Sequence, residues 1–309
     1  MTGGSERSPW RDRCVVVAYK TGYAVAHRLP PRISHVLARG AGWIMAPLMR
    51  DKRKMLERHL RRVDPSISHS VLRRASRNAL ASYARYYLES FRLPRMNAER
   101  VNATFTTHGF EHVTAGLAAG NGVILALPHL GGWEWAGRWM TDRGHAMNVV
   151  VEPLQPKALF EWFAGLRTDL GMKVMPLGPT VATDIAAALR RNEVVCLLCD
   201  RDIQRNGLEV TMFGEVTTLP SGPALMSLRT GAALLPVAVY FTDDVDGHHA
   251  VVRPRLGGEP TGKLRTDVGN LTQTLAGELE SLIAHAPEQW HLLQPNWPSD
   301  PGYELPSTE

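Results

Sequence analysis

The sequence predicts an α/β fold with a mostly parallel central sheet flanked by helices, preceded by amphipathic N-terminal helices. From about residue 105, short aliphatic or β-branched runs alternate with longer segments of helical spacing, which is typical of a parallel sheet covered by helices. Glycine or proline ends many of these segments. The chain has 309 residues and is 44% hydrophobic, so it can bury a sizeable core.

The N-terminal third is expected to be helical. Residues 1–12 are polar and are expected to form a frayed tail. Two apolar segments follow, residues 13–29 and 33–48, with Pro30-Pro31 between them. A long helix is expected over 66–91, with Ser66 or Ser68 as its cap and Leu93-Pro94 after its end.

The remainder alternates between strands and helices. Strands are expected at 122–127, 146–151, 173–176, 194–199 and 234–241, and helices at 109–119, 130–143, 156–170, 180–191, 223–230 and 267–284. A hairpin is expected to pair 208–212 with 215–218, and 250–253 is expected to be an edge strand. The change from helical segments to alternating strands and helices separates a basic amphipathic region, 1–100, from an α/β region, 101–309, and we expect both to belong to one integrated fold.

Charge is divided unevenly along the chain. Residues 1–100 carry 21 Lys and Arg against 7 Asp and Glu, a net of +14, whereas residues 101–309 carry 14 against 23, a net of −9. A basic third on an acidic body predicts a polyanionic partner, which could be a membrane surface, a nucleic acid or an acidic lipid head group. No helix-turn-helix, zinc-finger or RNP-type motif is present, which disfavours nucleic acid.

The same third has the composition of a membrane-surface helix. An apolar segment with Trp43 precedes a basic block that runs from Arg50 to Arg62. An apolar face beside a basic flank favours docking on anionic lipid, and the alternative is a helical cap whose basic face is solvated. No secretory signal is evident, and no stretch of 18 or more apolar residues predicts a membrane span.

The chain has three cysteines, Cys14, Cys196 and Cys199, which do not form a disulfide framework and suit a reducing compartment. The C-L-L-C motif lies in an expected buried strand. A redox pair requires an exposed thiol at a helix N-terminus, so structural thiols are favoured. Zinc is disfavoured because no second ligand pair has suitable spacing.

His129 follows an expected strand, Val123 to Leu127, at the strand's C-terminal end. Ligands bind at this edge in open α/β sheets. Histidine titrates near neutral pH, and Glu134 follows five positions later, so the two residues have the types of a general base and its orienting partner. The alternative is a turn histidine followed by a solvated glutamate in a first helical turn.

Other charged residues are expected at the same edge. Glu152 follows one strand, Asp200, Arg201 and Asp202 follow another, and Arg167 lies on the helix after Glu152. A structural ion pair is the alternative for a carboxylate beside an arginine. The chain lacks G-x-S-x-G, G-x-x-x-x-G-K-[ST] and H-E-x-x-H motifs, which disfavours an α/β-hydrolase, a P-loop protein and a zinc protease.

A histidine and a carboxylate without a nucleophilic side chain suit acyl transfer to a substrate hydroxyl. The histidine would remove the hydroxyl proton and the carboxylate would orient the ring. Backbone N–H groups would hold the oxyanion, and Gly131 and Gly132 are the candidates for exposing them.

The segment H-L-G-G-W-E, 129–134, resembles the H-x-x-x-x-D/E signature of the lysophospholipid acyltransferase superfamily. From about Tyr19 to Trp297 the chain also resembles the lipid A/phosphatidylinositol mannoside acyltransferase family, and most of all its actinobacterial phosphatidylinositol mannoside branch. The blocks that carry this resemblance are A-S-Y-A-R-Y-Y-L-E-S-F-R-L-P (81–94), V-I-L-A-L-P-H-L-G-G-W-E-W-A-G (123–137), V-V-V-E-P-L (149–154), C-L-L-C-D-R-D (196–202), L-P-S-G-P-A-L-M-S-L-R-T-G-A-A-L-L-P-V (219–237) and W-H-L-L-Q-P-N-W (290–297).

The resemblance implies a membrane-peripheral enzyme at the cytosolic face of the plasma membrane. Such enzymes transfer a fatty acyl chain, usually palmitoyl, from acyl-CoA to a mannose 6-hydroxyl of a phosphatidylinositol mannoside. The donor is a substrate, and no cofactor or metal is implied. A different acceptor, lipid A or another glycolipid, is an alternative, and a lipid-binding scaffold on the same fold is a non-enzymatic one.

The resemblance also assigns roles to residues. It implies His129 as the catalytic base with Glu134 as its partner, and it implies substrate-binding positions at Glu152, Arg167, Asp200 and Arg201. Two positions depart from the mycobacterial pattern. Glu134 stands where those enzymes tend to have Asp, and Asp200 stands where they have Glu, so each departure changes the reach of a carboxylate by one methylene.

Overall fold

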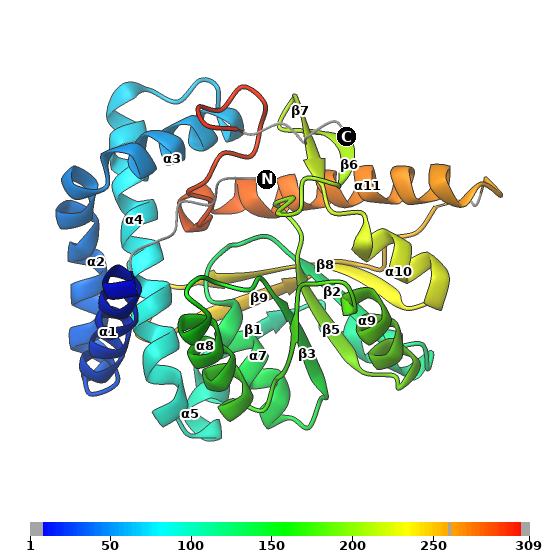
Figure 1. The fold of residues 1–309 in the computed structure, drawn as a ribbon, viewed down its shortest axis with the longest axis horizontal. Coiled ribbons are helices and arrows are strands. Elements are labelled where there is room, and N and C mark those ends of the chain that lie inside the picture. The colour runs from blue at the N-terminus through cyan, green and yellow to red at the C-terminus, as the bar shows by residue number, and fades with distance from the viewer. Residues whose placement is uncertain (1–8, 259–260, 304–309) are drawn as a thin grey trace.

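The computed structural model describes residues 9–258 and 261–303 (Figure 1). Four helices form the N-terminal part: α1 (Pro9–Ala26), α2 (Pro31–Leu48), α3 (Arg50–Val63) and α4 (His69–Arg92). Pro31 occupies the first position of α2, where its missing N–H costs nothing, and the Ser68 side chain caps α4 by accepting from the Val71 N–H. The predicted long helix is thus confirmed as α4.

The expected frayed tail is wrong for its last residues, because α1 already begins at Pro9; residues 1–8 lie outside the described residues. Tyr19 and Tyr23 of α1 pack edge-on against Phe163 and Trp162, so aromatic burial holds this face of α1. A small core joins α2, α3 and α4, consisting of Ala46, Leu56, Ala79, Leu80 and Leu293.

The rest of the chain alternates strands and helices as predicted. The elements in chain order are η1 (Leu93–Arg95), α5 (Ala98–Ala103), β1 (Phe105–His108), α6 (Glu111–Ala118), β2 (Val123–Leu127), α7 (Trp133–Asp142), β3 (Met147–Val151), α8 (Lys157–Asp169), β4 (Lys173–Pro176), α9 (Val181–Arg190), β5 (Val194–Leu198), β6 (Leu208–Met212), β7 (Glu215–Leu219), α10 (Gly222–Thr230), β8 (Ala233–Phe241), β9 (His248–Val252), α11 (Leu264–His285) and η2 (Pro287–Gln289).

The central sheet has seven strands in the order β1-β9-β8-β2-β5-β3-β4. The five strands from β8 to β4 run parallel, and β9 and β1 run the opposite way, so the prediction of a mostly parallel sheet is confirmed. The expected edge strand at 250–253 is wrong in position. It forms β9 between β8 and β1, because the four-residue strand β1 was not foreseen and takes the edge instead.

Alternate residues of the strands point to opposite faces of the sheet and pack into two hydrophobic cores, one on each face. Ile124 and Ala126 of β2 face the core that α9, α10 and α11 complete. Leu125 and Leu127 face the opposite core, to which α7 contributes Trp135, Trp139 and Met140. Figure 1 shows α11 on one side of the sheet, α7 on the other, and α1, α2 and α4 side by side at one end.

The predicted boundary near residue 100 falls within α5, and the division into two regions stays a prediction. Among residues 9–258 and 261–303, no helix is both long enough and apolar enough to cross a membrane.

Candidate active site

His129 and Asp200 meet at the C-terminal edge of the sheet. β2 and β5 are neighbours in register, with Leu127 opposite Leu198, and each of the two residues stands two positions after its strand ends. The Cys199 N–H extends the pairing by donating to the Leu127 carbonyl over 2.8 Å. Parallel pairing thus brings together two side chains that are 71 residues apart in sequence.

The contact between the two residues is double. Nδ1 of His129 lies 2.6 Å from Oδ1 of Asp200, and the His129 backbone N–H donates to Oδ2 over 3.0 Å. The Asp200 side chain is fully buried, whereas the His129 side chain remains 23% exposed. No described residue forms a hydrogen bond with Nε2 of His129, so this nitrogen is available to a substrate.

The protonation of the pair follows from its surroundings. Burial alone would raise the pKa of Asp200, but the charge and hydrogen bond of His129, the Trp290 indole and the His129 backbone N–H together hold that pKa below its ordinary value. An ionised Asp200 accepts the proton of Nδ1 and thereby leaves Nε2 as the basic nitrogen. The pair therefore has the form of a general base with an orienting carboxylate.

The C-terminal segment closes the site from outside the sheet. Trp290 donates its indole N–H to Oδ2 of Asp200 over 2.7 Å, and the Asn296 amide donates to the Asp200 carbonyl over 3.0 Å. The His291 backbone N–H donates to the His129 carbonyl over 2.7 Å. Burial lowers the pKa of the His291 ring to about 3, so this second histidine stays neutral beside the pair.

Glu134 does not take the predicted position next to His129. The prediction that it orients the His129 ring is wrong in this structure, because Asp200 fills that position. Glu134 lies in the first turn of α7 and accepts from the Tyr86 hydroxyl over 3.1 Å and from the Arg167 guanidinium. Five residues of turn and helix carry its carboxylate toward α4 and α8 instead of back to the histidine.

Glu134, Tyr86 and Arg167 form a hydrogen-bonded cluster around one oxygen of the Glu134 carboxylate. Burial, followed by the charge of Glu134, raises the pKa of Tyr86 well above its ordinary value, so Tyr86 remains a hydroxyl donor. Burial opposes the charge of Arg167, but Glu134 more than compensates and raises the pKa of Arg167. The Trp133 ring joins this cluster to the base: it stacks on Tyr86 at 4.2 Å and meets the His129 ring edge-on at 5.9 Å.

A second charged pair, which the sequence did not predict as a pair, forms at the same edge of the sheet. The Arg201 guanidinium donates to Glu152 over 2.5 Å, and these residues follow the neighbouring strands β5 and β3. Both side chains keep contact with solvent. The sequence prediction that charged residues after strand ends share one edge is thus met by His129, Glu152, Asp200 and Arg201.

The prediction that Gly131 and Gly132 expose free N–H groups is wrong. The Gly131 N–H donates to the Gln289 carbonyl over 2.9 Å, and the Gly132 N–H donates to the Val239 carbonyl over 3.0 Å. Gly131 has a φ of +63°, and a Cβ at this position would lie 1.9 Å from the Val239 carbonyl oxygen. The glycines therefore allow the turn to pack directly against β8, and their N–H groups are used by β8 and by the C-terminal segment at Gln289.

A small apolar cavity lies within the core beside α7. It has a volume of about 40 Å³ and lies between the sheet and α7. Trp133, whose ring contacts His129, forms part of its wall. The remaining lining is almost wholly apolar and includes Leu125, Leu127, Ala136, Trp139, Met140, Cys196, Val237 and Val239.

The cysteines are free, and Cys196 and Cys199 are buried. Burial, together with the charge of Glu134, raises the pKa of the Cys196 thiol to about 12, so this thiol stays protonated in the cavity wall. The described residues contain no cluster of His, Cys, Asp and Glu that could hold a metal ion.

Three contacts of the site were not foreseen from the sequence: those of Tyr86, Trp290 and Asn296. Tyr86 belongs to a helical stripe of tyrosines that spacing alone assigns to the core. Trp290 and Asn296 belong to the W-H-L-L-Q-P-N-W block, where a buried tryptophan and an amide outside the sheet are the available signal. Neither sequence pattern identifies the hydrogen-bond partner of these residues, because each partner lies more than 45 residues away in the sequence.

An α/β sheet that carries a histidine–carboxylate pair at its C-terminal edge, with an apolar cavity between the sheet and α7, is the architecture expected of an acyltransferase. The model of the bacterial lipid A biosynthesis acyltransferase family matches residues 6–299. The chain belongs to this family and is an acyltransferase enzyme.

Three relatives show which enzymes of this family the chain is similar to. The chain is 35% identical over 300 residues to the phosphatidylinositol mannoside acyltransferase of Mycolicibacterium smegmatis, covering 96% of this chain and 95% of the relative. It is 41% identical over 227 residues to the enzyme of the same name from Mycobacterium tuberculosis, covering 72% and 70%. It is 26% identical over 193 residues to the lipid A biosynthesis palmitoleoyltransferase of Escherichia coli, covering 62% and 60%.

Proposed function

We propose that this protein transfers a fatty acyl chain, palmitoyl in the first instance, from acyl-CoA to a mannose hydroxyl of a phosphatidylinositol mannoside. The acceptor is supported by the names of two mycobacterial relatives at 35% and 41% identity. The single structural observation that carries the chemistry is the 2.6 Å contact between His129 and Asp200 beside an apolar cavity.

In the proposed reaction, Nε2 of His129 accepts the proton of the sugar hydroxyl. The hydroxyl oxygen attacks the thioester carbonyl, the C–S bond breaks, and the CoA thiolate leaves. The imidazolium then returns the proton to that thiolate, so the products are an ester and CoA. Asp200 holds the ring by its Nδ1 proton and balances the imidazolium charge. Proton transfer by a positioned side chain such as His129 typically contributes about 10²- to 10⁴-fold in rate.

The acyl chain is proposed to enter the cavity between the sheet and α7. The present volume of about 40 Å³ holds less than a full palmitoyl chain, so the lining must move apart as the chain enters. Met140 and Met147 are the flexible members of this lining, and methionine accommodates such rearrangement well. Each buried methylene contributes about 0.8 kcal/mol, which favours a long acyl chain.

The remaining charged residues are proposed to bind substrate around this centre. Glu152 and Arg201 form an accessible pair at the same edge, which suits hydrogen bonding to sugar hydroxyls or to the polar part of the donor. Glu134 and Arg167 form a closed pair whose proposed task is to fix Trp133 and Tyr86 beside the base.

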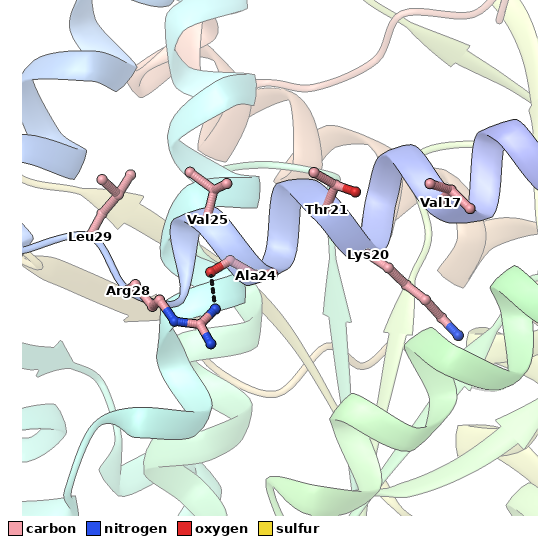
Figure 2. A pocket seen from close by; sticks show the side chains of 7 residues that line it. All are labelled: Val17, Lys20, Thr21, Ala24, Val25, Arg28 and Leu29. Atoms are coloured by element: carbon pink, nitrogen blue, oxygen red, sulfur yellow. Dashed lines mark hydrogen bonds between the residues drawn. The ribbon is translucent and has the colours of Figure 1, made fainter.

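We also propose that α1 and α2 dock on an anionic membrane surface. Large apolar side chains stand exposed on both helices, including Val17, Val25, Trp43, Ile44 and Leu48. Figure 2 shows Val17, Thr21 and Val25 along α1, with Lys20 on the same helix and Arg28 just after its end. These residues line a shallow groove of about 630 Å³. Apolar groups flanked by basic ones are the pattern of an interfacial helix.

Some basic residues of α3 form ion pairs within the protein, and others are exposed to solvent. Arg58 and Arg62 form ion pairs with Asp300, and Arg62 also reaches Glu215, so these charges are used inside the protein. Arg50, Lys52, Lys54 and Arg61 are exposed and remain available to lipid. Each basic residue near an anionic surface contributes about 1 kcal/mol, so this set supports peripheral binding.

The transfer reaction is tested with the purified protein, palmitoyl-CoA and a mixture of phosphatidylinositol mannosides and lipid A precursors, with product analysis by mass spectrometry. An acylated mannoside is expected, and transfer should fall at least about 100-fold in His129→Ala. Acylation of the lipid A precursor alone would contradict the proposed acceptor. Full activity of the variant would contradict the proposed base.

Membrane docking is tested by co-sedimentation with anionic and with zwitterionic vesicles. Leu48→Glu is expected to weaken binding to anionic vesicles, whereas Leu264→Glu, at an exposed leucine on α11, should leave it unchanged. High salt should weaken wild-type binding, because surface charge interactions are screened. Equal binding by both variants, or binding to neither vesicle, would reject this surface as the docking site.

A further inference from the structure

The Asp200 carboxylate has three hydrogen-bond donors, and two of them belong to His129 itself. The Nδ1 nitrogen and the backbone N–H of His129 reach one oxygen each. The third is the Trp290 indole, 2.7 Å from Oδ2. Trp290 is thus the one residue, other than the base, that the described part of the chain places in contact with this carboxylate.

The backbone around Trp290 is tied to the catalytic turn. Residue 290 forms an antiparallel bridge with Leu130, and its neighbours Gln289 and His291 bond to Gly131 and His129. The Gln289 side chain bonds both to the N–H and to the carbonyl of Phe241 at the end of β8, over 2.7 and 3.0 Å. The C-terminal segment is therefore joined by several hydrogen bonds to the turn that carries His129 and to the end of β8.

We propose that Trp290 is a positioning residue for the catalytic pair. During proton transfer the bonds from His129 to Asp200 change in strength, because the ring gains a proton at Nε2. The indole donor does not change, so it keeps the carboxylate in the plane that accepts from Nδ1. This inference rests on the proposed function, since it assigns Trp290 to the same reaction.

The sequence offers a matched control in Trp297. Its ring lies 6.2 Å from that of Trp290, it is as deeply buried, and its indole N–H donates to the Met212 carbonyl over 3.3 Å. Trp297→Phe therefore removes the same indole donor and a similar volume without touching Asp200. A purely structural role for Trp290 predicts equal effects of the two substitutions on catalysis.

Trp290→Phe is expected to lower kcat at least about 10-fold, as for loss of a hydrogen bond to a charged group, with the KM values for acyl-CoA and acceptor within about twofold of wild type. Trp297→Phe should keep kcat within about twofold. Replacement of Trp290 by benzothienylalanine, which has the shape of tryptophan but no N–H donor, should reproduce the kcat loss. Wild-type kcat with this analogue, or equal kcat losses in the two Phe variants, would overturn the proposal.

A double-mutant comparison tests whether Trp290 acts through the Asp200 carboxylate. In an Asp200→Asn background, Trp290→Phe should change kcat by less than about twofold, because the group that the indole positions is no longer a carboxylate. Additive losses would mean that Trp290 acts elsewhere and would overturn the proposal.

A spectroscopic measurement separates this inference from the proposed function. The Nδ1 proton between His129 and Asp200 is expected as a downfield proton resonance that is absent in His129→Ala. Trp290→Phe should shift it, and Trp297→Phe should not. If the wild-type protein transferred no acyl group, the proposed function would fail while this resonance still tested the contact; an unmoved resonance in Trp290→Phe would overturn the positioning role alone.

Discussion

Two histidine–carboxylate pairs lie near the turn at Gly131 and Gly132, and they differ in how far the histidine is exposed. His129 pairs with Asp200 over 2.6 Å, its side chain is 23% exposed, and its Nε2 has no hydrogen-bond partner among the described residues. His248 lies 3.1 Å from Glu89 through Nε2, and its Nδ1 lies 3.0 Å from the Asp246 carbonyl. His248 is also stacked on Trp135 at 4.5 Å and is almost wholly buried.

A third pair, His59 with Asp300, repeats the closed arrangement. Its Nδ1 lies 2.9 Å from the Leu292 carbonyl and its Nε2 3.3 Å from the carboxylate. A histidine beside a carboxylate is therefore common to structural and catalytic sites. A free ring nitrogen and solvent exposure distinguish the His129 pair, and both are needed by a general base, which must reach the proton that it removes.

The largest effect is expected when the open pair is broken. Asp200→Asn should lower kcat on the order of 10³-fold, because an amide can donate to Nδ1 and thereby stabilise the wrong ring tautomer. Steady-state kinetics with palmitoyl-CoA measure the loss, and thermal unfolding of the same variant checks that the fold persists. Retention of kcat would remove Asp200 from the mechanism.

The next effect concerns the closed Glu134 cluster. Glu134→Gln leaves the partly buried Arg167 without its charged partner, which should lower the free energy of unfolding by about 3 kcal/mol. Chemical denaturation measures this, and Glu134→Asp, which keeps the charge, should lose less. If Glu134→Gln instead retained its stability and lost kcat as heavily as Asp200→Asn, Glu134 would have a direct catalytic role.

Much of the fold was predictable because local pattern determines it. β2 and β5 are fully apolar runs bounded by glycine or proline or by charged residues, as buried parallel strands are. β1 was missed because it is four residues long and carries two threonines and a histidine. Its neighbour β9 was then placed at the edge, since no outer strand was available to cover it.

For the site, the sequence supports one rule: residues that follow parallel strands lie at the same edge of the sheet. That rule brought His129, Glu152, Asp200 and Arg201 together, but it could not choose which carboxylate contacts the histidine. Spacing in sequence favoured Glu134, whereas the register of β2 against β5 selects Asp200. The contribution of Trp290 depends on how the C-terminal segment folds back over the sheet, which no local pattern specifies.

A smaller effect is expected at the closed His248 pair. Burial alone would raise the pKa of Glu89, but contacts with His248 and Arg85 outweigh it and hold that pKa below its ordinary value. A carboxyl whose pKa falls on folding stabilises the protein above its unfolded pKa of about 4.3, and this stabilisation is lost as the pH falls through the folded pKa. Glu89→Gln should therefore lower stability by about 2 kcal/mol at pH 7.

Unfolding measured from pH 7 down to pH 3 tests this prediction. The difference between wild type and Glu89→Gln should shrink as the pH falls below about 4.3, while kcat at pH 7 stays close to that of wild type. Glu161→Gln, at an exposed pair with Lys157, serves as the control and should have a negligible effect. A difference that grows on acidification would mean that the pKa of Glu89 is raised by folding.

The smallest effect is expected for a substitution in the apolar cavity near the His129–Asp200 pair. Trp135 and Phe241 fill the surroundings of His248, whereas the cavity near His129 is lined by Ala136, whose side chain leaves room. Ala136→Phe should lower kcat/KM for palmitoyl-CoA about 10-fold relative to butyryl-CoA, since each excluded methylene forfeits about 0.8 kcal/mol and only a long chain reaches this part of the wall. Ala115→Phe, at an exposed position of α6, should leave the ratio unchanged. An equal loss for both donors in Ala136→Phe would place the acyl chain outside this cavity, and the difference between the two histidine pairs would then rest on the free ring nitrogen alone.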